Sequence, residues 1–486
     1  MNINTDVILL WTIAVPLIGA VLSFVVSDAT GRRLAAVTAF LTLVFAAMLG
    51  MGQKQGMWHE LDWEWVPALG LRLHLGVDGI SYPLVLLTAL LTLLCCGYSI
   101  WHTPTPGLGN HLGALLLVIE AGIIGTFLAQ DLVLFFIAFE VVLLPMAAVI
   151  AVWGGEGRRR AALKFALYTL AGSVLLLVGV VSVVIKTGSG DMTQPASLPP
   201  NTQLWIFILF AIAFAIKSPL WPLHTWLPDA HTEAPTVGSV ILAGVLLKMG
   251  TYGLIRVGLG VTPDGFAEAA PVLGVLAVAA IIVGSLVCLA QNELKRLIAY
   301  SSVGHMGFVL LGIATGSAIG LQAALIGNIA HGVLTGLLFF LAGAIKDRSH
   351  TGQLAELGGL RERAPWMAGI LGLAALGSLG LPGLAGFWGE AFAVFASYQR
   401  GGPLWTTLAV VAAVGGALTA AYLLRMLRKV SHGPLAPSLA TASEAHWPEV
   451  VAWAPLVFLA FLLGVVPVLV VDLAAGASLI SGAAGR

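Results

Sequence analysis

Seven titratable side chains stand inside long apolar stretches of the sequence, and all are of types that bind and release protons. They are Glu120, Glu140, Lys217, Lys248, His305, His331 and Glu390. An ionisable group in hydrocarbon costs about 2.5–3.5 kcal/mol on insertion scales, so each needs a reason to be there. A neighbouring charge can switch a buried lysine between holding and releasing a proton, and histidine titrates near neutral pH. Together these groups could form a row that carries protons across a membrane.

A structural explanation competes with this one. The two lysines and the carboxylates could neutralise each other and only lock helices together. Structure would need one or two such pairs, and every further pair costs desolvation. Seven groups on seven stretches therefore favour a proton path. Taken singly, His305 and His331 are as well explained as hydrogen-bonding core residues, and Glu120 stands near the end of its stretch and is a secondary candidate.

Two further histidines, His224 and His231, occur in the segment PLHTWLPDAHTEAP. Their spacing could suggest a metal site, but no third ligand pattern accompanies them. We therefore expect them to serve a connection between two helices and expect no metal.

Composition places these groups in a membrane. Of the 486 residues, 59% are apolar and 9% charged, and the 23 basic and 23 acidic residues balance. A soluble domain carries ~25% charged residues, and a nucleic-acid binder needs a basic face. The apolar runs are continuous, whereas a membrane barrel shows alternating segments of ~10 residues. The sequence predicts an all-α polytopic membrane protein with no nucleic-acid partner.

Segments of about 20 apolar residues predict fourteen membrane-spanning helices. Their limits are 7–27, 33–52, 79–100, 111–129, 131–153, 161–186, 203–223, 236–258, 270–290, 294–314, 319–345, 366–399, 405–429 and 449–473. Fifteen Lys and Arg residues then fall on one side, and six (Lys54, Arg72, Lys186, Arg256, Arg400 and Arg486) on the other. Because positive charge stays inside, the richer side is cytoplasmic and both termini lie outside, on the periplasmic side.

Two of these spans should be discontinuous. The seventh contains KSPLWP, with Pro219 and Pro222, and the twelfth contains GSLGLPGLAGFWGE, with Pro382. Proline inside a helix removes a hydrogen bond and clashes with the preceding turn. The breaks are five spans apart, an odd number, so spans 4–8 and 9–13 would form two inverted repeats, as in many transporters. The corresponding division is 1–110, 111–258, 259–430 and 431–486, the last a loop and span fourteen.

No G-x-G-x-x-G, P-loop, G-x-S-x-G or H-E-x-x-H motif occurs in the sequence. We therefore expect no cofactor in this chain. If it moves protons, the energy must come from a partner or from another ion gradient.

Three segments resemble a known family. They are FEVVLLPMAAVIAVWGGEGRRRAALKFALYTLAGS, KSPLWPLHTWLPDAHTEAPTVGSVILAGVLLKMGTYGLIR and ELKRLIAYSSVGHMGFVLLGI. They are similar to the antiporter-like membrane subunits of respiratory complex I, and the likeness covers about residues 70–475. Within that group the chain resembles the M-type subunits, the equivalent of mitochondrial subunit 4. M-type chains carry a glutamate in the broken twelfth helix, as Glu390 does here, where L-type and N-type chains usually carry lysine.

The resemblance implies a role for each site residue. Glu140 and Lys217 correspond to the coupled pair of the first half-channel, and Lys248 to the central relay lysine. His305 and His331 correspond to the polar link across the midplane. Glu390 corresponds to the terminal residue of the other half-channel, and Glu120 to a further carboxylate of the family.

The resemblance also implies the partners and the energy source. The chain would be a proton-translocating subunit of an NADH:quinone oxidoreductase in the bacterial plasma membrane. L-type and N-type subunits would lie on either side, with membrane lipids around it. NADH, FMN, iron–sulfur clusters and quinone would bind other subunits. A subunit of a Mrp-type sodium/proton antiporter and a packing subunit of the membrane arm are the alternatives, and a complex that takes electrons from ferredoxin also stays open.

Overall fold

The computed structural model describes residues 5–52, 55–66 and 71–477. Lys54 and Arg486, two of the residues used to orient the chain, lie outside these ranges. Within them, thirteen helical stretches are long and apolar enough to cross a membrane. The one remaining predicted span, 366–399, is divided into two shorter helices. The predicted helical membrane protein is thus confirmed, whereas the inverted repeat and the division into four regions stay predictions.

The elements follow the predicted spans closely. In the first half they are α1 (Thr5–Val25), α2 (Asp28–Met48), β1 (Met57–Val66), β2 (Leu71–Asp78), α3 (Ser81–Trp101), α4 (Gly109–Leu128), α5 (Leu132–Val141), α6 (Leu143–Trp153), α7 (Arg158–Thr187), α8 (Pro200–Lys217), α9 (Leu227–Glu233), α10 (Thr236–Ile241), η2 (Leu242–Leu246), α11 (Leu247–Gly253) and η3 (Leu254–Leu259). In the second half they are α12 (Pro263–Ala290), α13 (Leu294–Ala314), α14 (Ala318–Ser349), α15 (Leu360–Arg363), α16 (Pro365–Ser378), α17 (Gly386–Arg400), α18 (Gly402–Ser431), η4 (Pro437–Leu439), α19 (Trp447–Val465) and α20 (Val468–Ala475).

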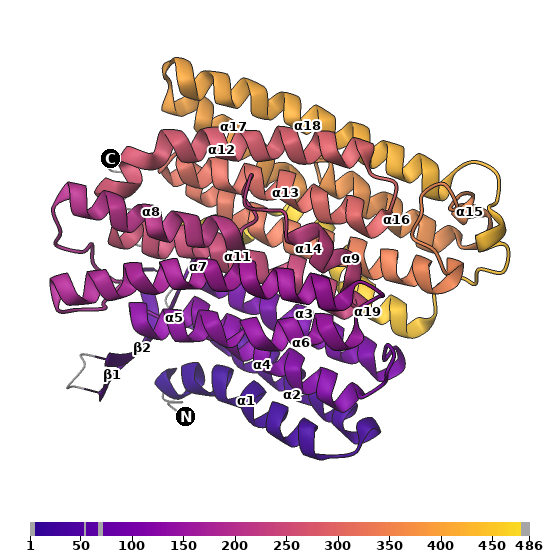
Figure 1. Ribbon diagram of the computed structural model, residues 1–486, viewed down its shortest axis with the longest axis horizontal. Helices are drawn as coiled ribbons and strands as arrows, with labels where there is room; N and C mark the ends of the chain where they lie inside the picture. The colour runs from indigo at the N-terminus through magenta and orange to yellow at the C-terminus, as the bar shows by residue number, and fades with distance from the viewer. Residues whose placement is uncertain (1–4, 53–54, 67–70, 478–486) are drawn as a thin grey trace.

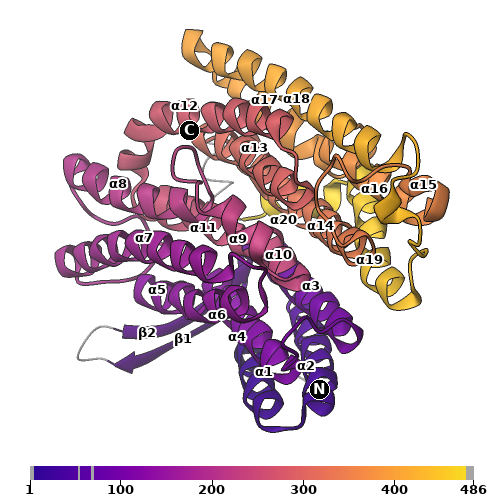
Figure 2. The same cartoon turned by 45° about the vertical axis from the view of Figure 1, so that its right-hand side comes forward.

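The helix axes lie roughly parallel to one another, and from α1 to α18 the chain crosses the bundle from one edge to the other (Figure 1). The last helices, α19 and α20, return and pack against α14. Figure 2 shows α1 and α2 at one edge, α12, α17 and α18 at the opposite edge, and α9 to α11 between them. The helices at the centre of the bundle are more buried than those at its edges. The span 236–259 is wholly buried and α4, α13 and α14 nearly so, whereas α1, α2, α7, α18 and α19 expose much of their apolar surface. Four of the candidate residues, Glu120, Lys248, His305 and His331, stand on these buried helices.

A β-hairpin that the sequence reading did not predict precedes α3. Strands β1 and β2 pair antiparallel, and the hairpin lies at the opposite end of the bundle from α15 (Figure 1). It is joined to the seam between α4 and α5, where the N–H of Gln130 donates to the carbonyl of His74 at 2.9 Å. At the same seam the Asp131 carboxylate accepts from the N–H groups of Val133 and Leu134 and caps α5. The predicted limits of spans four and five, 111–129 and 131–153, likewise leave a single residue between them.

The seventh span is broken where predicted. Helix α8 ends at Lys217, and the chain turns through 218–226 before α9 begins. The carbonyls freed by the break find partners, because the N–H of Leu220 donates to Ala215 and the indole of Trp226 to Ile216, both within 3 Å. Broken backbone inside a membrane protein persists where such partners exist.

The twelfth span is broken as well, between α16 and α17. Gly380 and Gly383 have φ of +79° and +91°, a region that other residues adopt only with strain. The N–H of Ala385 donates to the carbonyl of Ala460 in α19 at 2.9 Å, so the neighbouring helix supports the break. A Cβ on Gly380 would lie 3.0 Å from the carboxylate of Glu390, which places Glu390 against the break although it is eight residues beyond Pro382.

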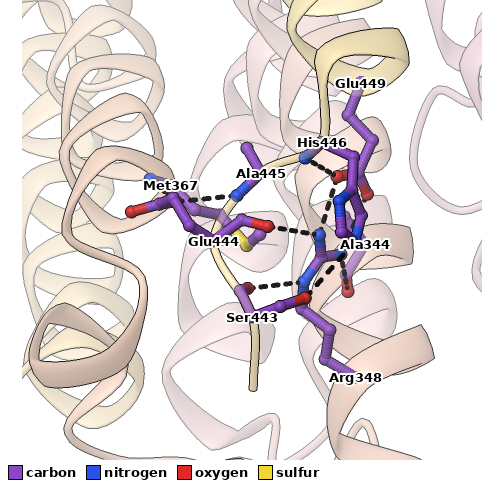
Figure 3. A network of polar contacts seen from close by, with 8 residues as sticks. All are labelled: Ala344, Arg348, Met367, Ser443, Glu444, Ala445, His446 and Glu449. Atoms are coloured by element: carbon purple, nitrogen blue, oxygen red, sulfur yellow. Dashed lines mark hydrogen bonds and ion pairs between the residues drawn. The ribbon is translucent and has the colours of Figure 1, made fainter.

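A polar cluster joins α14, α16 and α19 (Figure 3). The guanidinium of Arg348, near the end of α14, donates to both carboxylate oxygens of Glu449 and to the carbonyls of Ala344, Ser443 and Glu444. The Glu444 carboxylate in turn accepts from the first N–H groups of α16. The cluster therefore fixes α14, α16 and α19 relative to one another, and with them the first half of the broken helix.

Candidate functional site

Lys248 lies at the centre of the bundle and is fully buried. Its Nζ donates to the carbonyl of Ala243 at 2.5 Å and lies 2.6 Å from Nδ1 of His331 on α14. Ala243 belongs to η2, a π-helical turn directly before α11. Such turns are rare and often mark functional sites. The wider turn contributes the carbonyl that holds the ammonium beside the histidine.

A second contact continues from His331 toward the broken twelfth span. The rings of His331 and His305 have centroids 5.9 Å apart, and His305 Nδ1 lies 2.9 Å from Oε1 of Glu390. The sequence therefore predicted four residues that the structure brings together, from four separate spans. Lys248 is linked to Glu390 through two histidines.

A small cavity lies next to these two histidines. It is lined by His305, His331, Thr335, Ser378 and Glu390 among other residues, with about 30 Å³ of space for water. That is room for roughly one or two water molecules. Nε2 of each histidine has no hydrogen-bond partner in the described part of the chain. Because both histidines line the cavity, water there is a candidate partner for these two nitrogens.

Glu140 and Lys217 lie on α5 and at the end of α8, and no contact joins them to Lys248 among the described residues. The hydroxyl of Ser173 on α7 donates to the Glu140 carboxylate. The Lys217 ammonium lies 4.7 Å from the centroid of the Phe139 ring. The two opposite charges form no direct ion pair within residues 5–52, 55–66 and 71–477. Glu140 instead accepts a hydrogen bond from Ser173, and Lys217 instead lies over the ring of Phe139.

All four charged members of the row stand beside an interruption of regular helix. Lys217 ends α8, Lys248 follows the π-helical turn, and Glu390 packs against the Gly380 turn. Glu140 lies at the end of α5, where Val142 separates α5 from α6. Pro145 explains this last interruption, because it cannot donate to the carbonyl four residues earlier. The sequence reading missed it, although the proline was a visible signal.

Glu120 is placed apart from the other six. It is fully buried near the middle of α4, so the expectation that it stands near the end of its span was wrong. Neither carboxylate oxygen has a hydrogen-bond partner among the residues that the structure describes. The geometry therefore assigns it no contact with the row.

His224 and His231 belong to the connection between spans seven and eight, as expected. His224 lies in the turn after α8, and His231 lies in α9 and stacks on Phe339 with centroids 4.7 Å apart. In the described ranges no three His, Cys, Asp or Glu side chains are placed to hold a metal ion.

A buried ion pair at the end of the eighth span was not predicted. Arg256, used from sequence only to orient the chain, is buried in η3 and pairs with Asp78 at the end of β2. Lys295, one of the fifteen basic residues of the richer side, is buried in the first turn of α13 and donates to the carbonyl of Ala234 at 3.0 Å. The burial of these two residues was not predicted because span ends were judged by apolar length alone. Asp78 directly before the third span and Arg256 in the last turn of the eighth were the available signals.

The similarity of the chain to known proteins agrees with this geometry. Residues 129–416 match the family model described as "NADH:quinone oxidoreductase/Mrp antiporter, TM". NADH-quinone oxidoreductase subunit M of Rhodobacter capsulatus is 40% identical over 466 residues, which cover 92% of this chain and 89% of the relative. NAD(P)H-quinone oxidoreductase chain 4 1 of Synechococcus sp. (strain JA-3-3Ab) is 44% identical over 386 residues, covering 77% and 72%.

Solved structures extend the comparison to the fold. A chain of respiratory complex I from Thermus thermophilus superposes with a TM-score of 0.87 at 30% identity, covering 97% of this chain and 99% of that one. A chain of the Mrp complex from Dietzia sp. DQ12-45-1b gives the same TM-score at 26% identity, but only 52% of that longer chain is covered. The chain therefore belongs to the NADH:quinone oxidoreductase/Mrp antiporter family of membrane proteins, among the relatives named subunit M and chain 4 of NADH-quinone oxidoreductases.

Proposed function

We propose that this chain is a proton-translocating membrane-arm subunit of an NADH:quinone oxidoreductase. The observation that carries the proposal is the series of contacts from Lys248 through His331 and His305 to Glu390. Each member binds and releases protons, and the series crosses the most buried part of the bundle. A purely structural pair would need only one carboxylate and one lysine, because further buried charges cost desolvation.

The transfer along this series uses the two nitrogens of each imidazole. A proton passes from the Lys248 ammonium to Nδ1 of His331, and Nε2 of His331 gives up a proton to water in the cavity. Nε2 of His305 takes a proton from that water, and Nδ1 passes one to Glu390. Histidine suits this step because one ring nitrogen accepts while the other donates.

Glu140 and Lys217 load the row from the other end. The carboxylate favours the charged form of the lysine, so a change in the Glu140 charge changes the tendency of Lys217 to release its proton toward Lys248. With the orientation given by the basic residues, this end takes protons from the cytoplasm and both termini are periplasmic. The driving reaction is quinone reduction in other subunits, which would hold the NADH, FMN, iron–sulfur and quinone sites. L-type and N-type subunits would flank the chain.

Proton pumping by variants of the whole complex tests this proposal. We expect Glu140→Ala and Lys217→Ala to assemble, to oxidise NADH and to lose quinone-coupled proton pumping through this subunit. Glu268→Ala on the exposed face of α12 is the matched control and should pump as the wild type does. Wild-type pumping by either assembled site variant would overturn the proposal.

The similarity to the Mrp complex leaves an ion-driven antiporter as the second candidate. Sodium-dependent proton exchange by vesicles in the absence of NADH would favour it. A third outcome, in which site variants lose assembly but never pumping alone, would favour a packing subunit.

A further inference from the structure

The ion pair between Asp78 and Arg256 closes one end of the eighth span. Both side chains are buried, with exposed fractions of 2% and 8%. Asp78 is fixed from its own side, because its Oδ1 accepts from the N–H groups of Ile80 and Ser81, both at 3.0 Å. The pair thus ties η3 to the junction of β2 and α3, at the hairpin end of the bundle.

Arg256 stands on the same helical face as the central lysine. Lys248, Tyr252 and Arg256 follow at intervals of four residues, and the Arg256 guanidinium lies 5.7 Å from the centroid of the Tyr252 ring. The Tyr252 hydroxyl donates to the carbonyl of Phe127 at 2.7 Å, so the ring is fixed across this face. Eight residues of helix place Arg256 about 12 Å from Lys248, toward the hairpin end.

The stability of the folded protein gives little reason for a buried ion pair between Arg256 and Asp78. Desolvating two charges costs about as much as their attraction returns, and apolar residues of similar size often stabilise a protein more. The guanidinium keeps its charge at every physiological pH, so it cannot relay a proton as lysine or histidine can. A fixed positive charge in a narrow path does have one effect on proton movement, since it raises the electrostatic barrier to protons and other cations.

We propose that Arg256, held by Asp78, is an electrostatic plug that prevents a proton on Lys248 from leaving directly through the hairpin end of the eighth span. The remaining contact of Lys248 in the row is His331, so the plug directs the proton along the row to Glu390. This inference rests on the proposed function, because it matters only if Lys248 carries protons. It makes Arg256 and Asp78 positioning residues of the transport path.

Passive proton conductance tests the plug without turnover. The complete complex is placed in liposomes under a potassium diffusion potential, without NADH, and proton influx is followed with a pH-sensitive dye. The double variant Arg256→Met with Asp78→Asn removes the charge and leaves no unpaired partner. We expect its proton conductance to rise several-fold above the wild type, and that of Arg256→Lys, which keeps the charge, to stay at the wild-type value.

The hairpin provides a matched control. Arg72 and Asp62 form an ion pair of the same type between β2 and β1, but in an exposed position. Arg72→Met with Asp62→Asn should leave the conductance unchanged. A second variant, Arg256→Gln, replaces the charge with a neutral polar side chain and should also leak, so a folding defect of the double variant alone does not decide the result.

The outcomes separate the plug from the proposed function. Wild-type conductance in assembled Arg256→Met/Asp78→Asn and Arg256→Gln complexes would overturn the plug, even if Glu140→Ala abolishes pumping as expected. Equal leaks in Arg256→Lys and Arg256→Gln would also overturn it, because they would point to loosened packing instead of lost charge. Normal pumping by Glu140→Ala would instead overturn the proposed function.

Discussion

Nζ of Lys248 lies 2.6 Å from Nδ1 of His331, and the same ammonium donates to the carbonyl of Ala243. A carbonyl can only accept, so this second bond orients the ammonium without competing for its proton. The lysine donates to the histidine while charged, and after transfer the histidine Nδ1–H donates back to the neutral amine. The contact is therefore satisfied in both states, as a reversible relay requires.

Replacing Glu390 by glutamine tests the terminal member of the row. Glutamine keeps the size of the side chain and a hydrogen bond to His305, but it cannot take up a proton. We expect Glu390→Gln complexes to assemble and their quinone-coupled proton transport to fall by at least about tenfold, in line with the loss of a proton-transfer group. The measurement is the initial rate of proton translocation per NADH oxidised. Glu268→Gln on α12 is the control, and an unchanged rate in Glu390→Gln would contradict the role of Glu390.

The turn at Gly380 should tolerate no side chain. Its φ of +79° costs about 1–2 kcal/mol for an L-residue, and a new Cβ would lie 3.0 Å from the Glu390 carboxylate. We expect Gly380→Ala to lower both the thermal stability of the subunit in detergent and proton transport. Gly372→Ala within α16 is the control, since a Cβ at that position would meet no neighbouring group within 4 Å, and its transport should be unchanged. Equal behaviour of the two variants would show that the break does not position Glu390.

The cluster around Arg348 should contribute most of the stability where α14, α16 and α19 meet. Glu449 is fully buried, and removing one partner of a buried ion pair costs about 3–5 kcal/mol. Arg348→Ala is therefore expected to lower the unfolding temperature strongly, whereas Arg361→Ala on the exposed α15 should not. The double variant Arg348→Ala/Glu449→Ala should recover part of the loss, because it leaves no unpaired carboxylate. No recovery would mean that the bonds of Arg348 to backbone carbonyls, and not the ion pair, stabilise this end.

Much of this architecture was predictable from the sequence because a bilayer imposes simple rules. Apolar length identified the spans, and proline with glycine identified the breaks after Lys217 and before Glu390. Charge in an apolar stretch singled out the candidate residues. These signals are local, and each is visible within one or two helical turns.

The contacts between the residues were not predictable in the same way. Lys248 and His331 are 83 residues apart, and His305 and Glu390 are 85 apart, so their meeting depends on how separate helices are rotated and packed. The π-helical turn at Ala243 likewise has no signal in the neighbouring sequence. The hairpin was missed because a β-strand is stabilised only by pairing with a second strand. The ion pair of Arg256 was missed because its partner, Asp78, belongs to that hairpin.

The ratio of protons moved to NADH oxidised in Lys248→Met complexes decides whether protons pass through Lys248. Methionine fills the same volume without a charge, and Lys295→Met, which removes another buried lysine outside the row, is the matched control. We expect assembled Lys248→Met complexes to show a lower proton-to-NADH ratio than Lys295→Met complexes, which keep the wild-type ratio. A wild-type ratio in Lys248→Met would contradict a proton path through Lys248 and His331.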